Sequence, residues 1–143
     1  MKSRYRIEWS WPLLIAYSLL LAYWMLWGFG RTRLPEYSYN IIPLSTIRHY
    51  VPIHSMEALI NIAGNIGVFL PFGVLIPLAI QAGFAKTIAC FLPGILLLEL
   101  IQLITRRGSL DVDDVILNTI GVMIGYVLFR IIGNIWRRAA DDK

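Results

Sequence analysis

Long apolar stretches separated by short polar segments dominate the chain. They cover about residues 12–29, 58–80, 87–105 and 115–133. Because an α-helix rises about 1.5 Å per residue, each stretch comes near the roughly 30 Å thickness of a bilayer core. The pattern therefore predicts an all-α membrane protein, a bundle of four transmembrane helices formed by residues 1–143 as a single domain.

Composition and the flanks of the first stretch agree with this prediction. The chain is 57% hydrophobic and 15% charged, which is far from the composition of a soluble domain. Basic residues precede the first stretch, as they do in a signal peptide. However, the stretch is too long, is rich in tryptophan and lacks a small-residue cleavage site. We therefore interpret it as a retained membrane anchor.

The longest connection, about residues 30–57, is too short to bury a hydrophobic core of its own. Its tyrosines alternate with apolar residues and prolines, which is typical of a segment lying along the headgroup region. Ser45 or Thr46 is placed to cap a short helix through Tyr50. We predict an interfacial external loop, which either covers the polar side chains described below or only connects two spans.

Basic residues flanking the spans predict the orientation of the bundle. Four spans put both termini on one side, where the chain carries Lys2, Arg4, Arg6, Lys86, Arg130, Arg137, Arg138 and Lys143. The opposite side carries Arg31, Arg33, Arg48, Arg106 and Arg107. Because cytoplasmic segments carry the excess of lysine and arginine, we expect cytoplasmic N- and C-termini. The net charge of +4 is divided between two faces, so we expect no nucleic-acid surface.

The cysteine and histidine residues indicate neither a metal site nor a cofactor. Cys90 is alone and lies within the third stretch, where packing explains it. His49 and His54 lie in the external loop without a companion at the spacing of metal ligands.

Hydrogen-bonding and acidic residues gather near one end of three of the four stretches. Such groups are costly in hydrocarbon unless they find partners. The direction of each span brings these ends to the same side, so we predict a polar pocket in one layer beneath the outer surface. Its residues are Asn61, Asn65, Glu99, Gln102, Arg107, Asp111, Asp114 and Asn118.

Spacing suggests a role for several of these residues. Asn61 and Asn65 stand four apart, so they share a helix face and would align neighbouring helices. By helical rise, Glu99 lies about 9 Å below the surface, where a carboxylate needs a cation, water or a proton. Arg106 or Arg107 is the nearest cation in sequence, and we predict that Glu99 and Arg107 anchor the network.

Two further features have a purely structural interpretation. Asp111 lies three residues before Asp114, which is the spacing of a helix N-cap followed by an acid in the first turn. Gly121 and Gly125 form a pair of small residues four apart, which predicts close packing of two helices.

Four stretches of the chain carry a family resemblance. They are NIIPLSTI at 40–47, NIAGNIGVFLPFG at 61–73, ELIQ at 99–102, and RGSLDVDD at 107–114 continuing to NTIG at 118–121. In this order, they resemble the VanZ-like family of small bacterial membrane proteins. The family is named for a protein linked to resistance against teicoplanin, a lipoglycopeptide-type antibiotic. The resemblance implies a multi-pass protein of the bacterial plasma membrane that acts in envelope or antibiotic-resistance physiology, and it implies no established reaction. Position 44 is leucine here, where phenylalanine is common in the family.

Three functions fit these residues. The one we favour is binding without catalysis, with an amphiphile such as a membrane lipid, a lipid-linked wall precursor or a lipoglycopeptide as the ligand. The second is an intramembrane enzyme that uses Glu99 and Asp114 as acid and base on an envelope lipid. The chain offers no serine, cysteine or histidine nucleophile arrangement within the membrane. The third is a structural or transport subunit that forms a homo-oligomer through its glycine faces.

Overall fold

The computed structural model describes residues 8–28 and 30–141, and in these residues it contains helices and two short strands. In chain order they are α1 (Ser10–Trp27), β1 (Ser38–Asn40), α2 (Ser45–Tyr50), α3 (Met56–Ile80), α4 (Phe84–Thr105), β2 (Ser109–Asp111) and α5 (Val112–Asp141). The helices α1, α3, α4 and α5 are long and apolar enough to cross a membrane. The predicted all-α bundle with four membrane-length helices is therefore confirmed.

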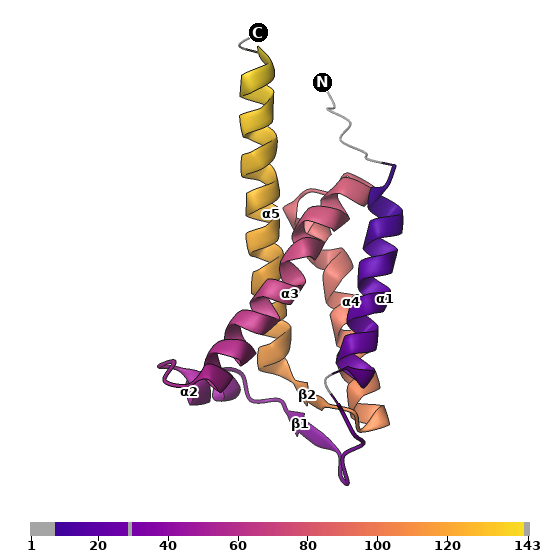
Figure 1. Ribbon diagram of the computed structural model, residues 1–143, viewed down its shortest axis with the longest axis vertical. Helices are drawn as coiled ribbons and strands as arrows, with labels where there is room; N and C mark the ends of the chain where they lie inside the picture. Colours follow the sequence, from indigo (N-terminus) through magenta and orange to yellow (C-terminus); the bar gives the residue numbers. More distant parts are fainter. Residues whose placement is uncertain (1–7, 29, 142–143) are drawn as a thin grey trace.

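The bundle has two different ends (Figure 1). The start of α1 and the end of α5 lie at one end, together with the short connection between α3 and α4. The strands and α2 lie at the opposite end, which we call the loop end. Six residues of the predicted polar pocket belong to α3, α4 and α5, while Asp111 ends β2 and Arg107 lies between α4 and β2.

Hydrogen-bonding side chains set the first residues of α3 and α5. The hydroxyl of Ser55 accepts a hydrogen bond from the Ala58 N–H at 3.1 Å, so α3 begins two residues before the predicted span. At the start of α5, the carboxylate of Asp111 accepts from the Asp113 N–H at 2.8 Å. This is the N-cap that the sequence predicted. The last helix runs on to Asp141, beyond the predicted end at residue 133.

Glycines let α3 and α5 pack backbone against backbone. A Cβ at Gly121 would collide with the carbonyl oxygen of Ile66, and one at Gly125 would collide with that of Leu70. Gly73 on α3 faces the backbone of α5 in the same way. The predicted close approach at Gly121 and Gly125 is therefore present, and its partner is the helix α3 of the same chain.

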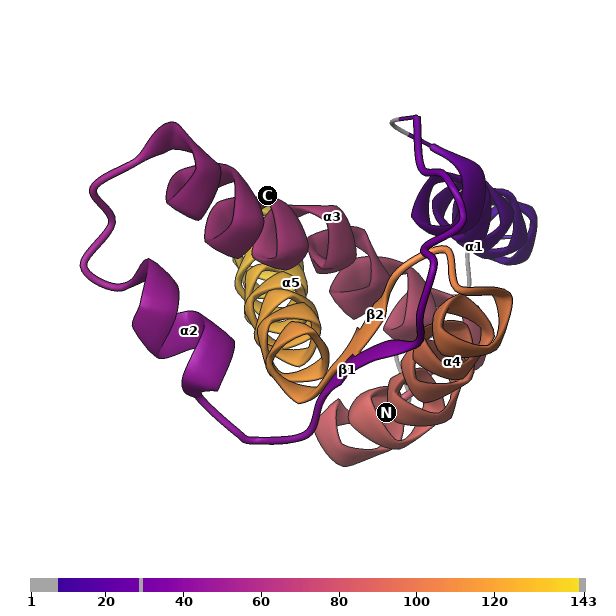
Figure 2. The same ribbon diagram turned by 90° about the horizontal axis from the view of Figure 1, so that it is seen from below.

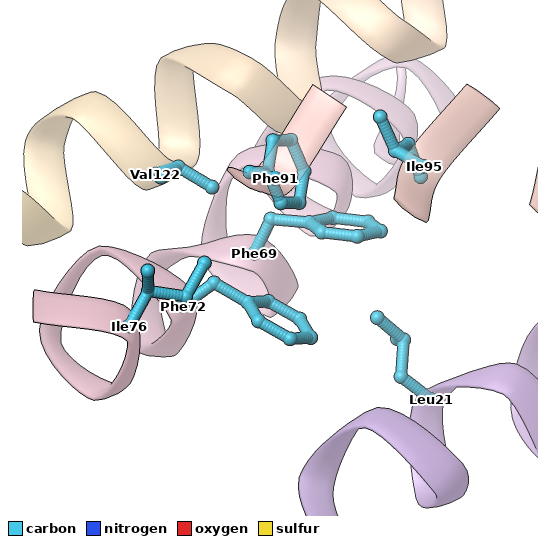
Figure 3. Packing of buried hydrophobic residues seen from close by; sticks show 7 residues of the cluster. All are labelled: Leu21, Phe69, Phe72, Ile76, Phe91, Ile95 and Val122. Carbon is cyan, nitrogen blue, oxygen red and sulfur yellow. The ribbon is translucent and has the colours of Figure 1, made fainter. Parts of the chain in front are cut away.

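A cluster rich in aromatic rings forms the buried core between the four long helices (Figure 3). The rings of Phe69 and Phe72 on α3 and of Phe91 on α4 lie with their centroids 5.6–5.9 Å apart. Leu21 of α1 points toward this cluster, and Val122 contributes from α5. The buried cluster consists of Leu21, Phe69, Phe72, Ile76, Phe91, Ile95 and Val122.

A parallel pair of strands, which the sequence did not predict, crosses the loop end. Ser38, Tyr39 and Asn40 of β1 lie opposite Ser109, Leu110 and Asp111 of β2. Seen from below, the pair runs between α4 and α5, while α2 lies beyond it against α3 and α5 (Figure 2). The external loop is thereby joined to the start of the last helix.

The short helix predicted through Tyr50 is present as α2, but neither Ser45 nor Thr46 caps it. Leu44 precedes the helix in the left-handed region, with φ 65°, and no side chain of the cap residue bonds the first turn. The first backbone N–H groups of α2 are bound by a side chain from another part of the chain, described below.

Candidate functional site

A partly open cavity of about 440 Å³ lies near the loop end, and we call it the polar cavity. All but one of the residues predicted for the polar pocket line it. These are Asn61, Asn65, Glu99, Gln102, Asp111, Asp114 and Asn118. Arg107 is the residue of the predicted set that does not line this cavity.

Glu99 reaches the polar cavity from α4 and is almost completely buried, with 1% of its surface exposed. Its Oε2 accepts a hydrogen bond from the backbone N–H of Asp111 at 3.3 Å. The carboxylate therefore joins the last turns of α4 to the end of β2. Its partner is a backbone amide, and not the arginine that the sequence predicted.

Asp114 and Asn65 form the contact that joins α5 to α3 inside the cavity. The Asn65 Nδ2 donates to Asp114 Oδ1 at 3.0 Å. The two carboxylates of Glu99 and Asp114 thus line one cavity but have different partners, one a backbone amide and the other a side-chain amide. This difference is the kind of asymmetry that acid–base pairs use.

The side-chain amides of Gln102, Asn118 and Asn61 differ in whether they have a hydrogen-bond partner. Gln102 donates from Nε2 to the carbonyl oxygen of Met25 at 2.9 Å, which fastens α4 to the last turns of α1. Asn118 is 1% exposed, and its buried Oδ1 has no hydrogen-bond partner among the described residues. The same holds for the Oδ1 of Asn61. Buried amide oxygens without partners are uncommon, because each leaves a desolvation cost uncompensated.

Among the described residues, the basic residue that lines the polar cavity is Arg31, and not Arg107. Its positive charge acts on both Glu99 and Asp114, and its guanidinium donates to the backbone carbonyl of Arg107 at 3.2 Å. The guanidinium of Arg107 itself lies over the ring of Trp27, 5.6 Å from the ring centroid.

Arg106 is also turned away from the cavity. Its guanidinium donates to the Pro35 carbonyl at 2.7 Å and lies over the ring of Tyr37. Arg106 ends α4 with a positive φ of 56°, so the chain leaves the helix in a new direction there. This change of direction moves Arg106 and Arg107 away from the helix face that carries Glu99. Extending the helix past Glu99 in the sequence therefore predicted the wrong arginine as its partner.

Two aspartates at the start of α5 bind the external loop. The carboxylate of Asp113, which has 0% of its surface exposed, accepts from the backbone N–H groups of Leu44, Thr46 and Ile47 at 2.5, 2.8 and 3.0 Å. It therefore supplies the missing cap of α2, with its negative charge at the positive end of that helix. The sequence pattern includes Asp113 in an acidic run but gives no signal for this partner.

Asp111 completes this attachment, which we call the loop clamp (Asn40, Thr46, Asp111 and Asp113). Its Oδ2 accepts from the Thr46 hydroxyl at 2.6 Å, and its Oδ1 accepts from the Asn40 amide at 3.2 Å. Because Thr46 and Asp111 also line the polar cavity, the loop clamp forms part of the cavity wall. The external loop therefore covers part of the polar layer, and it does not merely connect two spans.

An apolar groove of about 510 Å³ adjoins the polar cavity between α1, α3 and α4. Leu21 and Phe69 line both spaces, so the two share a wall. Away from this wall, the groove is lined by Ile76, Ile80, Cys90 and Gly94, among other residues. A polar space with an apolar space beside it can receive the two halves of one amphiphile.

Comparisons with known proteins identify relatives of this chain. The family model described as VanZ/LLP1 matches residues 13–133. The chain is 38% identical over 66 residues to a protein named "Protein VanZ" from Enterococcus faecium, a region covering 46% of this chain and 41% of that relative. The aligned region thus spans less than half the length of that relative. No solved structure matches the chain.

Proposed function

The chain belongs to the VanZ/LLP1 family, and from this premise we propose that it is a bacterial plasma-membrane protein that binds an amphiphile. The polar cavity would hold the head of this molecule, and the apolar groove would hold its tail. The proposal rests on one observation, namely that Leu21 and Phe69 line both the polar cavity and the apolar groove. A ligand that bridges this wall would satisfy buried polar groups at one end and bury hydrocarbon at the other.

The orientation of the chain is part of the proposal. The surplus of basic residues on the side of the termini favours cytoplasmic N- and C-termini, which would leave the polar cavity in the outer half of the membrane. An amphiphile taken up there would come from the outer leaflet. Membrane lipids, lipid-linked wall precursors and lipoglycopeptide antibiotics share the required two-part chemistry. A contribution to envelope physiology or glycopeptide-antibiotic resistance would follow from capturing one of them.

The proposal can be tested by filling the groove. Gly94 lines the groove, and a Cβ placed on it would meet no atom within 4 Å, so Gly94→Leu occupies the tail space without an obvious clash. Gly67→Leu is the matched control, because Gly67 on α3 is also open to its surroundings but does not line either space. Native mass spectrometry of chains released from membrane nanodiscs would count the amphiphiles that stay bound.

We expect the unmodified chain and Gly67→Leu to retain an amphiphile, and Gly94→Leu to retain at least about tenfold less, since that corresponds to only about 1.4 kcal/mol of binding free energy. Equal retention by all three proteins would rule out the groove as the tail site.

Acid–base catalysis on a bound envelope lipid is the second candidate, because Glu99 and Asp114 line the same cavity with different partners. Glu99→Gln and Asp114→Asn keep the size of each side chain and remove its ability to exchange a proton. If each variant retained full function in cells, acid–base chemistry would be excluded and the binding role would stand. Self-association is a further prediction, which crosslinking in the membrane would test; Gly121 and Gly125 are not available for it, because they pack against α3 of the same chain.

A further inference from the structure

Several hydrogen-bond acceptors of the polar cavity have unused lone pairs. Asn118 is buried to 1% exposure, and its Oδ1 faces no donor among the described residues. Asn61 adds a second buried amide oxygen in the same condition. The carboxylates of Glu99 and Asp114 each accept one hydrogen bond, although a carboxylate offers about four lone-pair positions.

Three residues that line the cavity already donate a hydrogen bond to other parts of the chain. Gln102 gives its amide to the Met25 carbonyl, and Asn65 gives its amide to Asp114. Arg31 donates to a backbone carbonyl beside the cavity. A ligand that brings its own N–H donors would therefore meet acceptors without displacing any of these contacts, whereas a ligand that brings only acceptors would compete with these contacts for their donors.

The charges of the cavity also favour a cationic ligand. The carboxylates of Glu99, Asp111 and Asp114 line it, and Arg31 is the basic residue among the described residues of its lining. A further cation would balance part of the remaining negative charge, and in surroundings of low dielectric this balance matters more than it does in water. A phosphate or sulfate head would instead add another negative charge beside the three carboxylates.

We propose that the head group bound in the polar cavity carries a primary ammonium, which Glu99 and Asp114 hold as counter-ions while the amide oxygens of Asn61 and Asn118 accept its remaining N–H groups. The inference rests on the proposed function and names its ligand class. It favours a primary over a quaternary ammonium, because a quaternary group has the charge but no N–H to offer the amide oxygens. An ammonium on a resident lipid and one on an exogenous amphiphile share this chemistry.

The experiment uses the full chain in nanodiscs of phosphatidylcholine, a lipid whose only amine is quaternary. Three probes share one twelve-carbon tail and differ in the head: dodecylamine, dodecyltrimethylammonium and dodecyl sulfate. Native mass spectrometry gives the concentration of each probe at which half of the chains carry it. We expect this concentration to be at least tenfold lower for dodecylamine than for either of the other probes.

Variants test whether the preference for dodecylamine arises in the polar cavity. Glu99→Gln and Asn118→Leu should each reduce the preference for dodecylamine over dodecyltrimethylammonium to less than threefold, while Gly67→Leu should leave it unchanged. If one of these variants does not fold, the ranking of the three probes on the unmodified chain still decides the question.

The source of the ammonium is tested separately. A chain extracted with an amine-bearing lipid that dodecylamine displaces would support a resident lipid as the source. A chain extracted empty that still prefers dodecylamine would support an exogenous amphiphile.

The outcomes separate this inference from the proposed function. If all three probes bind equally, or dodecyl sulfate binds best, and Gly94→Leu still abolishes their binding, then the ammonium inference is overturned while amphiphile binding stands. If Gly94→Leu leaves the binding of every probe unchanged, the groove is overturned as the tail site, while the ranking of the three probes still decides the ammonium inference.

Discussion

The carboxylate of Asp113 accepts a hydrogen bond from the backbone N–H of Thr46 at 2.8 Å, across 67 residues of sequence. The same carboxylate binds the N–H groups of Leu44 and Ile47, so one buried side chain serves as the cap of a helix in another part of the chain. The loop clamp thereby makes the external loop a fixed part of the polar cavity.

Replacing Asp113 should therefore release the loop. Asp113→Ala removes a charged acceptor from three backbone N–H groups, and hydrogen bonds to charged groups are worth about 1.5–3 kcal/mol each before the site relaxes. We expect a lower unfolding temperature and faster proteolysis between residues 40 and 50. Glu36→Ala, in the exposed part of the same loop, is the control and should leave both unchanged. Unchanged proteolysis in Asp113→Ala would show that the clamp does not hold the loop.

The contact between Asn65 and Asp114 predicts an energetic coupling of α3 with α5. The two side chains are joined at 3.0 Å, so Asn65→Ala and Asp114→Ala should not be additive in their effect on stability. We expect a coupling of about 0.5–3 kcal/mol in a double-mutant cycle measured by thermal or chemical unfolding. Asn65→Ala combined with Glu36→Ala is the control cycle and should be additive. A coupling near zero in the first cycle would argue against a direct bond.

The sequence predicts those features of the fold that depend on residues close together in the chain. Apolar stretches of membrane length determine the four spans, and Asp111 caps α5 through a residue only two positions away. The clustering of Asn61 and Glu99 at one level also follows, because depth along a helix is a matter of counting.

The parts that the sequence does not predict depend on distant contacts. The strands β1 and β2 are three residues each, too short for an alternating pattern to be recognised, and they pair across about 70 residues. The choice of Arg31 over Arg107 depends on the left-handed turn at Arg106, which no spacing rule places. Arg31 follows the first span, which places it on the same side of the membrane as the other loop-end residues. This position in the sequence is the signal that could have identified Arg31 as the basic residue of the cavity.

The glycines between α3 and α5 should tolerate no side chain. A Cβ at Gly125 would collide with the carbonyl oxygen of Leu70, so Gly125→Ala must push two backbones apart. Overpacking of this kind costs about 1–3 kcal/mol, and we expect a corresponding fall in the unfolding temperature. Gly67→Ala is the matched control, because its Cβ meets nothing and alanine favours the helix. Equal stability of the two variants would contradict the close packing.

Arg31 and Arg107 should differ in their effect on ligand binding. If an ammonium binds at Glu99 and Asp114, then Arg31 competes with it for the same carboxylates. Arg31→Gln should lower the stability of the empty chain and increase the affinity for dodecylamine several-fold. Arg107→Gln should leave that affinity unchanged, because the Arg107 guanidinium lies over Trp27 and not in the cavity. The opposite ranking would make Arg107 the cation that matters and restore the role predicted from the sequence.

The orientation of the bundle can be tested with the single native cysteine removed. In a Cys90→Ser background, Glu36→Cys reports on the loop end, and Gly83→Cys reports on the connection between α3 and α4 at the opposite end. Both positions are exposed, and a Cβ at Gly83 meets no other atom. Because the excess of basic residues favours cytoplasmic termini, a membrane-impermeant maleimide added to intact bacterial cells whose outer layers it can cross should label Glu36→Cys alone. Gly83→Cys should react only after the cells are opened. Labelling in the reverse pattern would turn the polar cavity toward the cytoplasm and remove the outer leaflet as the source of its ligand.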